Sequence, residues 1–170
     1  MVQLPDYERI ALVLQGGGAL GAYQAGVFEG LQEAGIEPNW ISGISIGALN
    51  TAIIAGNPPA RRAERLHEFW NTICQSNNGF GLFPWVEQSL FRFNDLTRSS
   101  LSALYGMSAV MDGQNGFFTP RFPPPSLYMK SNVERVGFYD MSPLHETLER
   151  LCDFDLINNG HLNVSVGAVN

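Results

Sequence analysis

Residues 40–50 read WISGISIGALN, and this stretch predicts a strand, a tight turn and a helix in immediate succession. Its first five residues form a short, mostly apolar run, as in buried strands. The small and apolar residues from Gly47 onward predict a mostly buried helix, which the run GNPP at 56–59 ends. Ser45 lies in the turn with a glycine two positions away on each side, the G-x-S-x-G spacing of a nucleophilic serine. One stretch therefore predicts a fold element and a candidate site together.

A second strand–turn–helix unit precedes this stretch. Residues 10–14 are a continuous apolar run that we expect to be a strand buried on both faces, and three consecutive glycines at 16–18 break it. Apolar residues then recur at intervals of three and four up to Leu31, which predicts a helix that stops near Gly35. Two such units in succession predict the α/β class, with a parallel sheet covered by helices.

The rest of the chain contributes three further regular segments and one unusual region. We expect an amphipathic helix over 60–74, a helix over 142–151 and a strand that begins at Leu162. Residues 79–130 contain most of the 11 phenylalanines and a triple proline, and they show weak periodicity. We therefore expect residues 1–170 to form a single domain that contains an insertion or lid at 79–130.

The aromatic residues early in this insertion have two interpretations. They line an acyl groove or form a lid that touches lipid, or else they fill the core of an inserted subdomain. The residues concerned are Phe80, Phe83, Trp85, Phe91 and Phe93. The sequence favours neither interpretation over the other.

Composition and charge argue against several classes of function. The net charge of -6 and the lack of a Lys/Arg run argue against a nucleic-acid partner, because phosphates need basic side chains. No apolar run is long enough to cross a membrane, so we expect a cytoplasmic protein, with peripheral membrane contact through apolar residues left open. The two cysteines, Cys74 and Cys152, lack metal-ligand spacing, and we expect reduced thiols, no metal and no cofactor.

The glycines at 16–18 lie between a strand and a helix, where exposed backbone N–H groups suit an anion. Two interpretations compete for this loop. Gly16, Gly18 and Gly21 satisfy the G-x-G-x-x-G spacing of a dinucleotide site, which also needs an acidic residue at the end of the second strand. Residues 41–43 read ISG at that position and contain no carboxylate. The sequence therefore favours the second interpretation, an oxyanion hole for acyl transfer.

Acyl transfer requires a nucleophile, and it requires donors for the negative charge that develops on the carbonyl oxygen. Ser45 is the candidate nucleophile, and Gly43 and Gly47 leave room for the strained turn that exposes its hydroxyl. The expected oxyanion donors are the backbone N–H groups of Gly16, Gly17, Gly18 and Ile46. Two glycine loops at successive strand-to-helix junctions are far more specific than either loop alone.

Both junctions resemble the patatin-like lipid acyl hydrolase family. Residues 12–27 (LVLQGGGALGAYQAGV) look like its oxyanion block, and residues 43–50 (GISIGALN) look like its nucleophile block. The resemblance is close over 9–56. It is looser over the later segments 117–121, 139–144 and 164–170, which look like a bacterial branch of the family. It implies a three-layer helix/parallel-sheet/helix sandwich, with Ser45 as the nucleophile and residues 16–18 as the oxyanion loop.

The sequence departs from the family pattern beside the glycine loop. Many members carry Arg or Lys two residues after the glycines, where this chain has Leu20. Positive side-chain charge near the oxyanion is therefore missing. We expect stabilisation to rest on backbone donors and on the helix dipole.

The serine also needs a base to take its proton. The resemblance implies an aspartate in a D-G-G or D-G-A turn far downstream, and this chain has neither tripeptide. Its only Asp-Gly pair begins at Asp112, for which an ordinary turn is the alternative. A catalytic triad would instead use His67, His145 or His161. Because the final strand precedes the aspartate turn in the family, we expect this chain to be the N-terminal part of a longer enzyme, truncated within the domain at its C-terminus.

The function predicted from the sequence is a serine acyl hydrolase that acts on lipid esters through an acyl-enzyme on Ser45, as in phospholipase A and lysophospholipase. One alternative is a hydrolase or acyltransferase for another acyl ester, a thioester or a polyester. A second alternative is a non-catalytic acyl-binding fragment, because the aspartate of the dyad is missing. The expected partner is a lipid or other acyl ester, and the oligomeric state is left open.

Overall fold

A computed structural model describes residues 6–74, 99, 103, 106–107, 109–122, 137–160 and 162–168. The chain divides into two compact units. The first comprises Met1–Trp70 together with Leu148–Asn170, and the second comprises Asn71–Thr147. The candidate nucleophile and the glycine loop both belong to the first unit.

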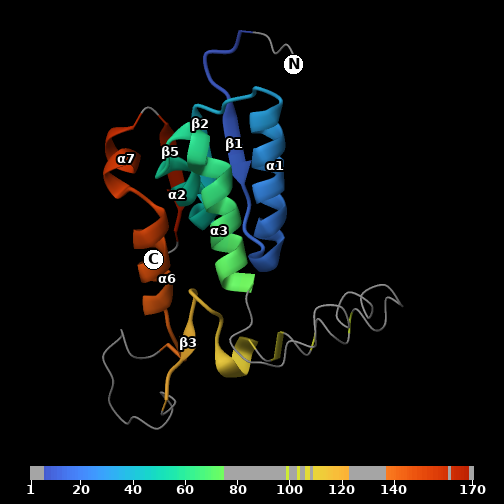
Figure 1. Cartoon of the computed structure of the whole chain (residues 1–170), viewed down its shortest axis with the longest axis vertical. Coiled ribbons are helices and arrows are strands. Elements are labelled where there is room, and N and C mark those ends of the chain that lie inside the picture. The colour runs from blue at the N-terminus through green and yellow to red at the C-terminus, as the bar shows by residue number, and fades with distance from the viewer. Residues whose placement is uncertain are drawn as a thin grey trace. The chain divides into compact units, whose positions relative to one another are not determined.

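A three-stranded parallel sheet organises the first unit. Strand β2 (Trp40–Ile44) lies in the centre, with β1 (Ala11–Leu14) on one side and β5 (Asn163–Gly167) on the other (Figure 1). In this register Ile41 lies beside Leu12 of β1 and beside Val164 of β5. The predicted α/β class with a parallel sheet is therefore confirmed, and the final strand joins the first two although more than 100 residues separate it from β2.

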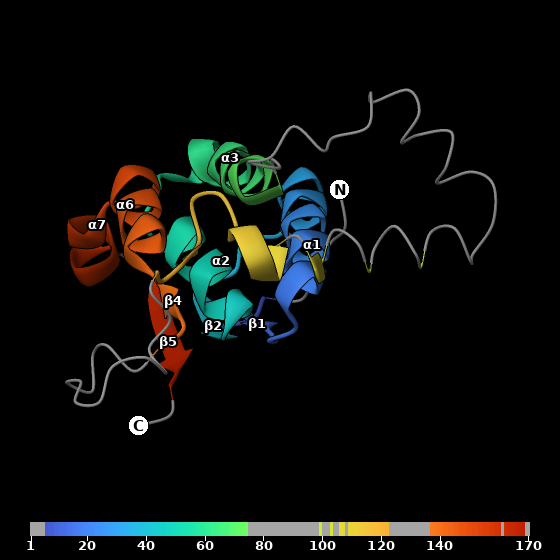
Figure 2. The same cartoon turned by 90° about the horizontal axis from the view of Figure 1, so that it is seen from below.

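Helices connect and cover these strands. The turn η1 (Gly18–Leu20) and helix α1 (Gly21–Glu33) follow β1, and helix α2 (Ile46–Ala55) follows β2 directly. The remaining helical elements with their bounds are the turn η2 (Pro59–Arg61), α3 (Arg62–Cys74), α6 (Ser142–Leu151) and α7 (Phe154–Asn159). The view along the strands shows α1, α2 and α3 on one side of the sheet (Figure 2).

The two faces of the sheet differ strongly in exposure. Ile41 on the helix-covered face is 0% exposed, whereas Val13 and Ile44 on the opposite face are 74% and 50% exposed. Helices α1, α2 and α3 all lie against the face that carries Ile41, and among the described residues no helix covers the opposite face (Figure 2). The expectation that residues 10–14 are buried on both faces was therefore wrong for the described part of the chain.

The hydrophobic core fills the space between the sheet and the helices. Helix α3 contributes Leu66, Phe69 and Trp70 from the predicted apolar stripe, and all three are buried. The rings of Phe69 and Trp70 meet edge to face with centroids 5.5 Å apart. Other buried members are Leu14, Ala25, Phe28, Ile41, Ile53, Ile54 and Leu151.

Asn57 joins the end of α2 to the end of α6. Its side-chain amide is buried and donates to the carbonyl oxygens of Ile53, at 2.8 Å, and Leu151, at 2.7 Å. Its own backbone carbonyl accepts a hydrogen bond from Nε of Arg62 at 3.0 Å. One asparagine thus supports the carboxyl end of α2 and holds a segment 94 residues away.

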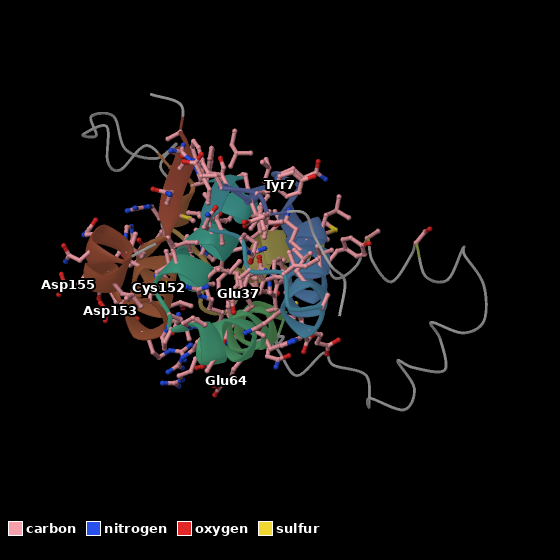
Figure 3. The ribbon with its side chains drawn as sticks, turned by 90° about the horizontal axis from the view of Figure 1, so that it is seen from above. Tyr7, Glu37, Glu64, Cys152, Asp153 and Asp155 are labelled. Atoms are coloured by element: carbon pink, nitrogen blue, oxygen red, sulfur yellow. The ribbon has the colours of Figure 1, made fainter. Side chains whose placement is uncertain are left out.

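Helix α7 was not predicted from the sequence. Asp153 begins it, because its carboxylate accepts a hydrogen bond from the Leu156 N–H at 3.0 Å as an N-cap. Figure 3 shows Asp153 and Asp155 on the outer side of this helix. A six-residue helix carries too short a pattern for periodicity to reveal it.

The second unit contains a short antiparallel pair. Strand β3 (Thr119–Pro120) pairs with β4 (Tyr139–Asp140), and the ring of Phe118 lies 4.7 Å from that of Tyr139. The hydroxyl of Thr147 donates to the Gly116 carbonyl at 2.8 Å.

The aromatic residues of the expected groove or lid, Phe80, Phe83, Trp85, Phe91 and Phe93, lie outside the described residues. Within the part of the chain that the structure describes, no helix is long and apolar enough to cross a membrane.

Replacing Asn57 with Ala should lower the free energy of unfolding by about 1–3 kcal/mol, because buried carbonyls lose their donor. Urea denaturation followed by circular dichroism measures the change. The control is Asn158→Ala in α7, where the exposed side chain should leave the value within about 0.5 kcal/mol. Equal effects of the two substitutions would contradict the role assigned to Asn57.

Candidate active site

Ser45 occupies a strained turn between β2 and α2. Its backbone has φ of 54° and ψ of -127°, and it is the only non-glycine residue with positive φ among the described residues. Such a conformation costs about 1–3 kcal/mol and persists only where the surroundings impose it. The serine is exposed. A strained, exposed serine between a strand and a helix has the geometry of a nucleophile elbow.

The start of α2 provides backbone donors beside this serine. The carbonyl of Ser45 accepts hydrogen bonds from the N–H groups of Ala48, at 2.8 Å, and Leu49, at 3.4 Å. The N–H groups of Ile46 and Gly47 in the first turn have no acceptor within the helix. The amino end of the helix dipole adds partial positive charge at the same place. This end of α2 is therefore suited to developing negative charge.

Gly43 and Gly47 allow the elbow to approach its neighbours closely. A Cβ atom added at Gly43 would lie 2.2 Å from the carbonyl oxygen of Gly47. A Cβ atom at Gly47 would lie 2.1 Å from the carbonyl oxygen of Leu14, at the end of β1. Both distances are far shorter than van der Waals contact, so neither position accepts a side chain without a backbone shift.

The glycine loop after β1 lies directly beside the serine. A Cβ atom added at Gly16 would be 3.2 Å from Cβ and 3.8 Å from Oγ of Ser45. Gly17 and Gly18 have φ of 144° and 56°, which L-residues with side chains rarely adopt. The carboxyl ends of parallel strands meet at one edge of a sheet, and this brings the two predicted loops together.

The residues that the sequence offered as a base for Ser45 lie in different parts of the chain. His67 on α3 has its Nε2 3.1 Å from a carboxylate oxygen of Glu29 on α1, and both side chains are exposed. Asp112 and His145 belong to the second unit, and His161 lies outside the described residues. Within the described ranges, no side chain forms a hydrogen bond with the Ser45 hydroxyl.

The cysteines are poor competitors for the role of nucleophile. Burial raises the pKa of Cys152 to about 11, so this side chain is a protonated thiol at neutral pH. Burial of part of its side chain also raises the pKa of Cys74, although that residue is exposed overall. In the described part of the chain, no group of three or more His, Cys, Asp or Glu residues could hold a metal ion.

The structure reveals polar residues behind the glycine loop that the sequence did not single out. Asn50 on α2 is completely buried and bonds with Gln24 of α1 and with Trp70 of α3. The available signal was the single amide side chain in the otherwise small and apolar beginning of α2, which reads IGALN. A buried polar residue in such a helix must find partners, and here they lie next to the candidate site.

A shallow groove also runs beside the glycine loop. It lies between β1 and α1 and has a volume of about 320 Å³. Two of its residues, Leu20 and Tyr23, are 67% and 78% exposed. The lining consists of Leu12, Val13, Leu14, Gln15, Leu20, Tyr23, Gln24 and Val27. Leu20 stands where many members of the family that the sequence resembles carry a basic residue. Its side chain makes this side of the loop apolar.

Comparison with known proteins identifies a family that this chain resembles over most of its length. The family model described as patatin-like phospholipase matches residues 12–169. The lysophospholipase nte1 of Aspergillus terreus is 54% identical over 46 residues, which cover 27% of this chain and 3% of that protein. The neuropathy target esterase sws of Drosophila melanogaster is 52% identical over 44 residues, which cover 26% and 3% of the two chains.

A third relative matches over a longer stretch. The patatin-like phospholipase domain-containing protein 6 of Homo sapiens is 41% identical over 61 residues, which cover 36% of this chain and 4% of that protein. The matched stretch is thus a small part of each of these much longer relatives. No solved structure gives a significant match.

Replacing Gly47 with Ala should lower the free energy of unfolding by about 1–3 kcal/mol, because the new methyl group overlaps the Leu14 carbonyl. The same substitution at Gly26 is the matched control. Gly26 lies within α1 with open space around it, so Ala there should be neutral or stabilising by up to about 1 kcal/mol. Urea denaturation of both variants measures the difference, and stability of Gly47→Ala equal to that of Gly26→Ala would contradict the predicted overlap.

Proposed function

Because the chain belongs to the patatin-like phospholipase family, we propose that it hydrolyses lipid esters through an acyl-enzyme formed on Ser45. The observation that carries this proposal is the contact between two backbone features. Ser45 is held at a φ of 54°, and Gly16 approaches so closely that a Cβ there would lie 3.8 Å from the serine Oγ. A nucleophile and a glycine loop in contact are what acyl transfer requires.

The proposed reaction has two steps. Oγ of Ser45 attacks the carbonyl carbon of the ester, and the electron pair of the C=O bond moves to oxygen. The oxyanion receives hydrogen bonds from N–H groups of the loop 16–18 and from Ile46. The tetrahedral intermediate then collapses, and the alcohol leaves with a proton. Water attacks the acyl-enzyme in the same manner, which releases the acid and restores the serine.

Backbone donors carry the electrostatic part of this proposal. One preorganised donor at an oxyanion is worth about 3–4 kcal/mol of barrier. The side chain of Leu20 brings no charge to the loop, so the N–H groups and the dipole of α2 supply the positive potential. We therefore propose an oxyanion hole made of backbone alone, at Gly16, Gly17, Gly18 and Ile46.

The proton of Ser45 must pass to a base. Asp112 is one candidate from the sequence, because it begins the only Asp-Gly pair of the chain. Gly113 has a φ of 86°, so an ordinary turn is the alternative explanation of this pair. Asp112→Asn removes the carboxylate and keeps the size of the side chain, so unchanged reactivity of Ser45 in this variant would exclude Asp112 as the base.

Lipid esters are favoured over small water-soluble esters by the surface beside the loop. Leu20 and Tyr23 expose large apolar side chains, which suit contact with acyl chains or with a membrane surface. Relatives named lysophospholipase and esterase support the same class of substrate. Binding of acyl compounds without turnover is the second candidate function, favoured by the unbonded hydroxyl of Ser45 in the described part of the chain.

A fluorophosphonate probe should label the folded chain at Ser45, because the probe requires an activated serine. Mass spectrometry of the peptide that contains residue 45 locates the adduct. Ser45→Ala should abolish labelling, whereas Ser42→Ala, a nearby serine on β2, should leave it unchanged. Silence of the wild-type chain, or labelling elsewhere, would contradict the proposed acyl-enzyme. Silence of the wild-type chain together with binding of a lysophospholipid would support acyl binding without turnover.

A further inference from the structure

A series of side-chain hydrogen bonds runs from α3 through α2 and α1 to the residue before the glycine loop. Nε1 of Trp70 donates to Oδ1 of Asn50 at 3.1 Å. Nδ2 of Asn50 donates to Oε1 of Gln24 at 2.9 Å. Nε2 of Gln24 in turn donates to the backbone carbonyl of Gln15 at 2.7 Å. The series therefore ends at the peptide unit that joins Gln15 to Gly16.

The direction of each amide in this series is determined by its neighbours. The indole N–H of Trp70 only donates, so it requires the oxygen of Asn50. The nitrogen of Asn50 then faces two acceptors, Oε1 of Gln24 and the Gly21 carbonyl, the latter at 3.0 Å. With its oxygen bound to Asn50, Gln24 presents its nitrogen to Gln15. Each oxygen and nitrogen therefore has one consistent assignment.

The series is anchored to α2, the helix that follows the candidate nucleophile. Asn50 lies in α2, which begins immediately after Ser45, and its side chain is completely buried. A buried amide that loses a hydrogen-bond partner is left unsatisfied, so the orientation of Asn50 is strongly held. Gly21 contributes to this packing, because a Cβ there would lie 2.7 Å from the ring of Trp70.

The peptide between Gln15 and Gly16 links this series to the oxyanion loop. In a planar trans peptide, the carbonyl and the following N–H point in opposite directions. Holding the Gln15 carbonyl therefore holds the direction of the Gly16 N–H. Gly47 supports the same carbonyl from another side, since a Cβ at Gly47 would lie 2.7 Å from the Gln15 oxygen. Glycines are otherwise free to turn, so a loop of three needs such a constraint.

We propose that Gln24 is a positioning residue that sets the direction of the Gly16 N–H beside Ser45, with Asn50 and Trp70 setting the direction of Gln24. This inference rests on the proposed function, because it assigns a role within the oxyanion hole. Gln24 does not act on the substrate. It acts through the peptide unit ahead of the loop.

The first test compares Gln24→Met with Gln32→Met. Both glutamines lie on α1 and donate to a backbone carbonyl at 2.7 Å, but Gln32 bonds to Pro59. Met keeps the size of the side chain and removes the donor. The second-order rate of fluorophosphonate labelling at Ser45 should fall about tenfold or more in Gln24→Met, as part of the ~100–1000-fold effect of losing an oxyanion donor. The rate should stay near the wild-type value in Gln32→Met. Equal rates in the two variants would overturn the proposal.

Gln24→Glu supplies a readout that a purely structural role would not change. An ionised Glu still accepts from Asn50 but has no proton for the Gln15 carbonyl, whereas a protonated Glu donates again. The labelling rate of Gln24→Glu relative to wild type should therefore rise as pH falls from about 7 to about 5, toward the range in which Glu protonates. A ratio that stays constant with pH, together with an unchanged melting temperature, would overturn the role of the donor.

The third measurement does not depend on reactivity. In the ¹⁵N–¹H NMR spectrum, the amide resonance of Gly16 should move in Gln24→Met and stay in place in Gln32→Met. If the probe fails to label the wild-type chain, the proposed function fails, and a shifted Gly16 resonance still supports the positioning role. A Gly16 resonance that is unchanged in Gln24→Met overturns that role whether or not the serine reacts.

Discussion

The close backbone contact between α2 and the end of β1 is the constraint on which the rest of the site depends. At Gly47 the helix comes so near to the Leu14 carbonyl that no Cβ fits between them. Parallel pairing of β1 with β2 brings the ends of both strands to the same edge. Only with both conditions met can the loop after β1 touch the serine after β2. The strained backbone conformation of Ser45 persists because these contacts prevent the turn from relaxing to a negative φ.

Among the described residues, the polar groups around the glycine loop belong to the backbone and to the amide side chains of Asn50 and Gln24. Leu20 stands beside the loop where a basic residue would be usual in the family, and the beginning of α2 offers N–H groups instead. Behind the loop, Trp70, Asn50 and Gln24 form a satisfied series of hydrogen bonds. Asn50 is completely buried, so any other orientation of its amide would leave a donor or an acceptor without a partner.

Local patterns predicted the parts of the fold that local interactions determine. The strand over 40–44, the helix after Gly47 and the end of the first helix near Gly35 follow from apolar runs, periodicity and glycine. Helix α7 and the β3–β4 pair were not predicted, since they are short and depend on a cap or on a partner 19 to 21 residues away. The exposure of Val13 was also missed, because the apolar pattern of a strand does not show which of its two faces the helices cover.

By itself, the sequence determined the two glycine junctions, the candidate nucleophile and the α/β class, because turn chemistry and hydrophobic periodicity act over a few residues. Only the tertiary structure decided that Gly16 contacts Ser45, that His67 pairs with Glu29, and that Gln24 reaches the peptide before the loop. The two residues in each of these contacts are separated by 9 to 38 positions in the chain. Pairing of β1 with β2 is what brings Gly16 to Ser45. Such contacts depend on strand order and helix packing, which no local pattern encodes.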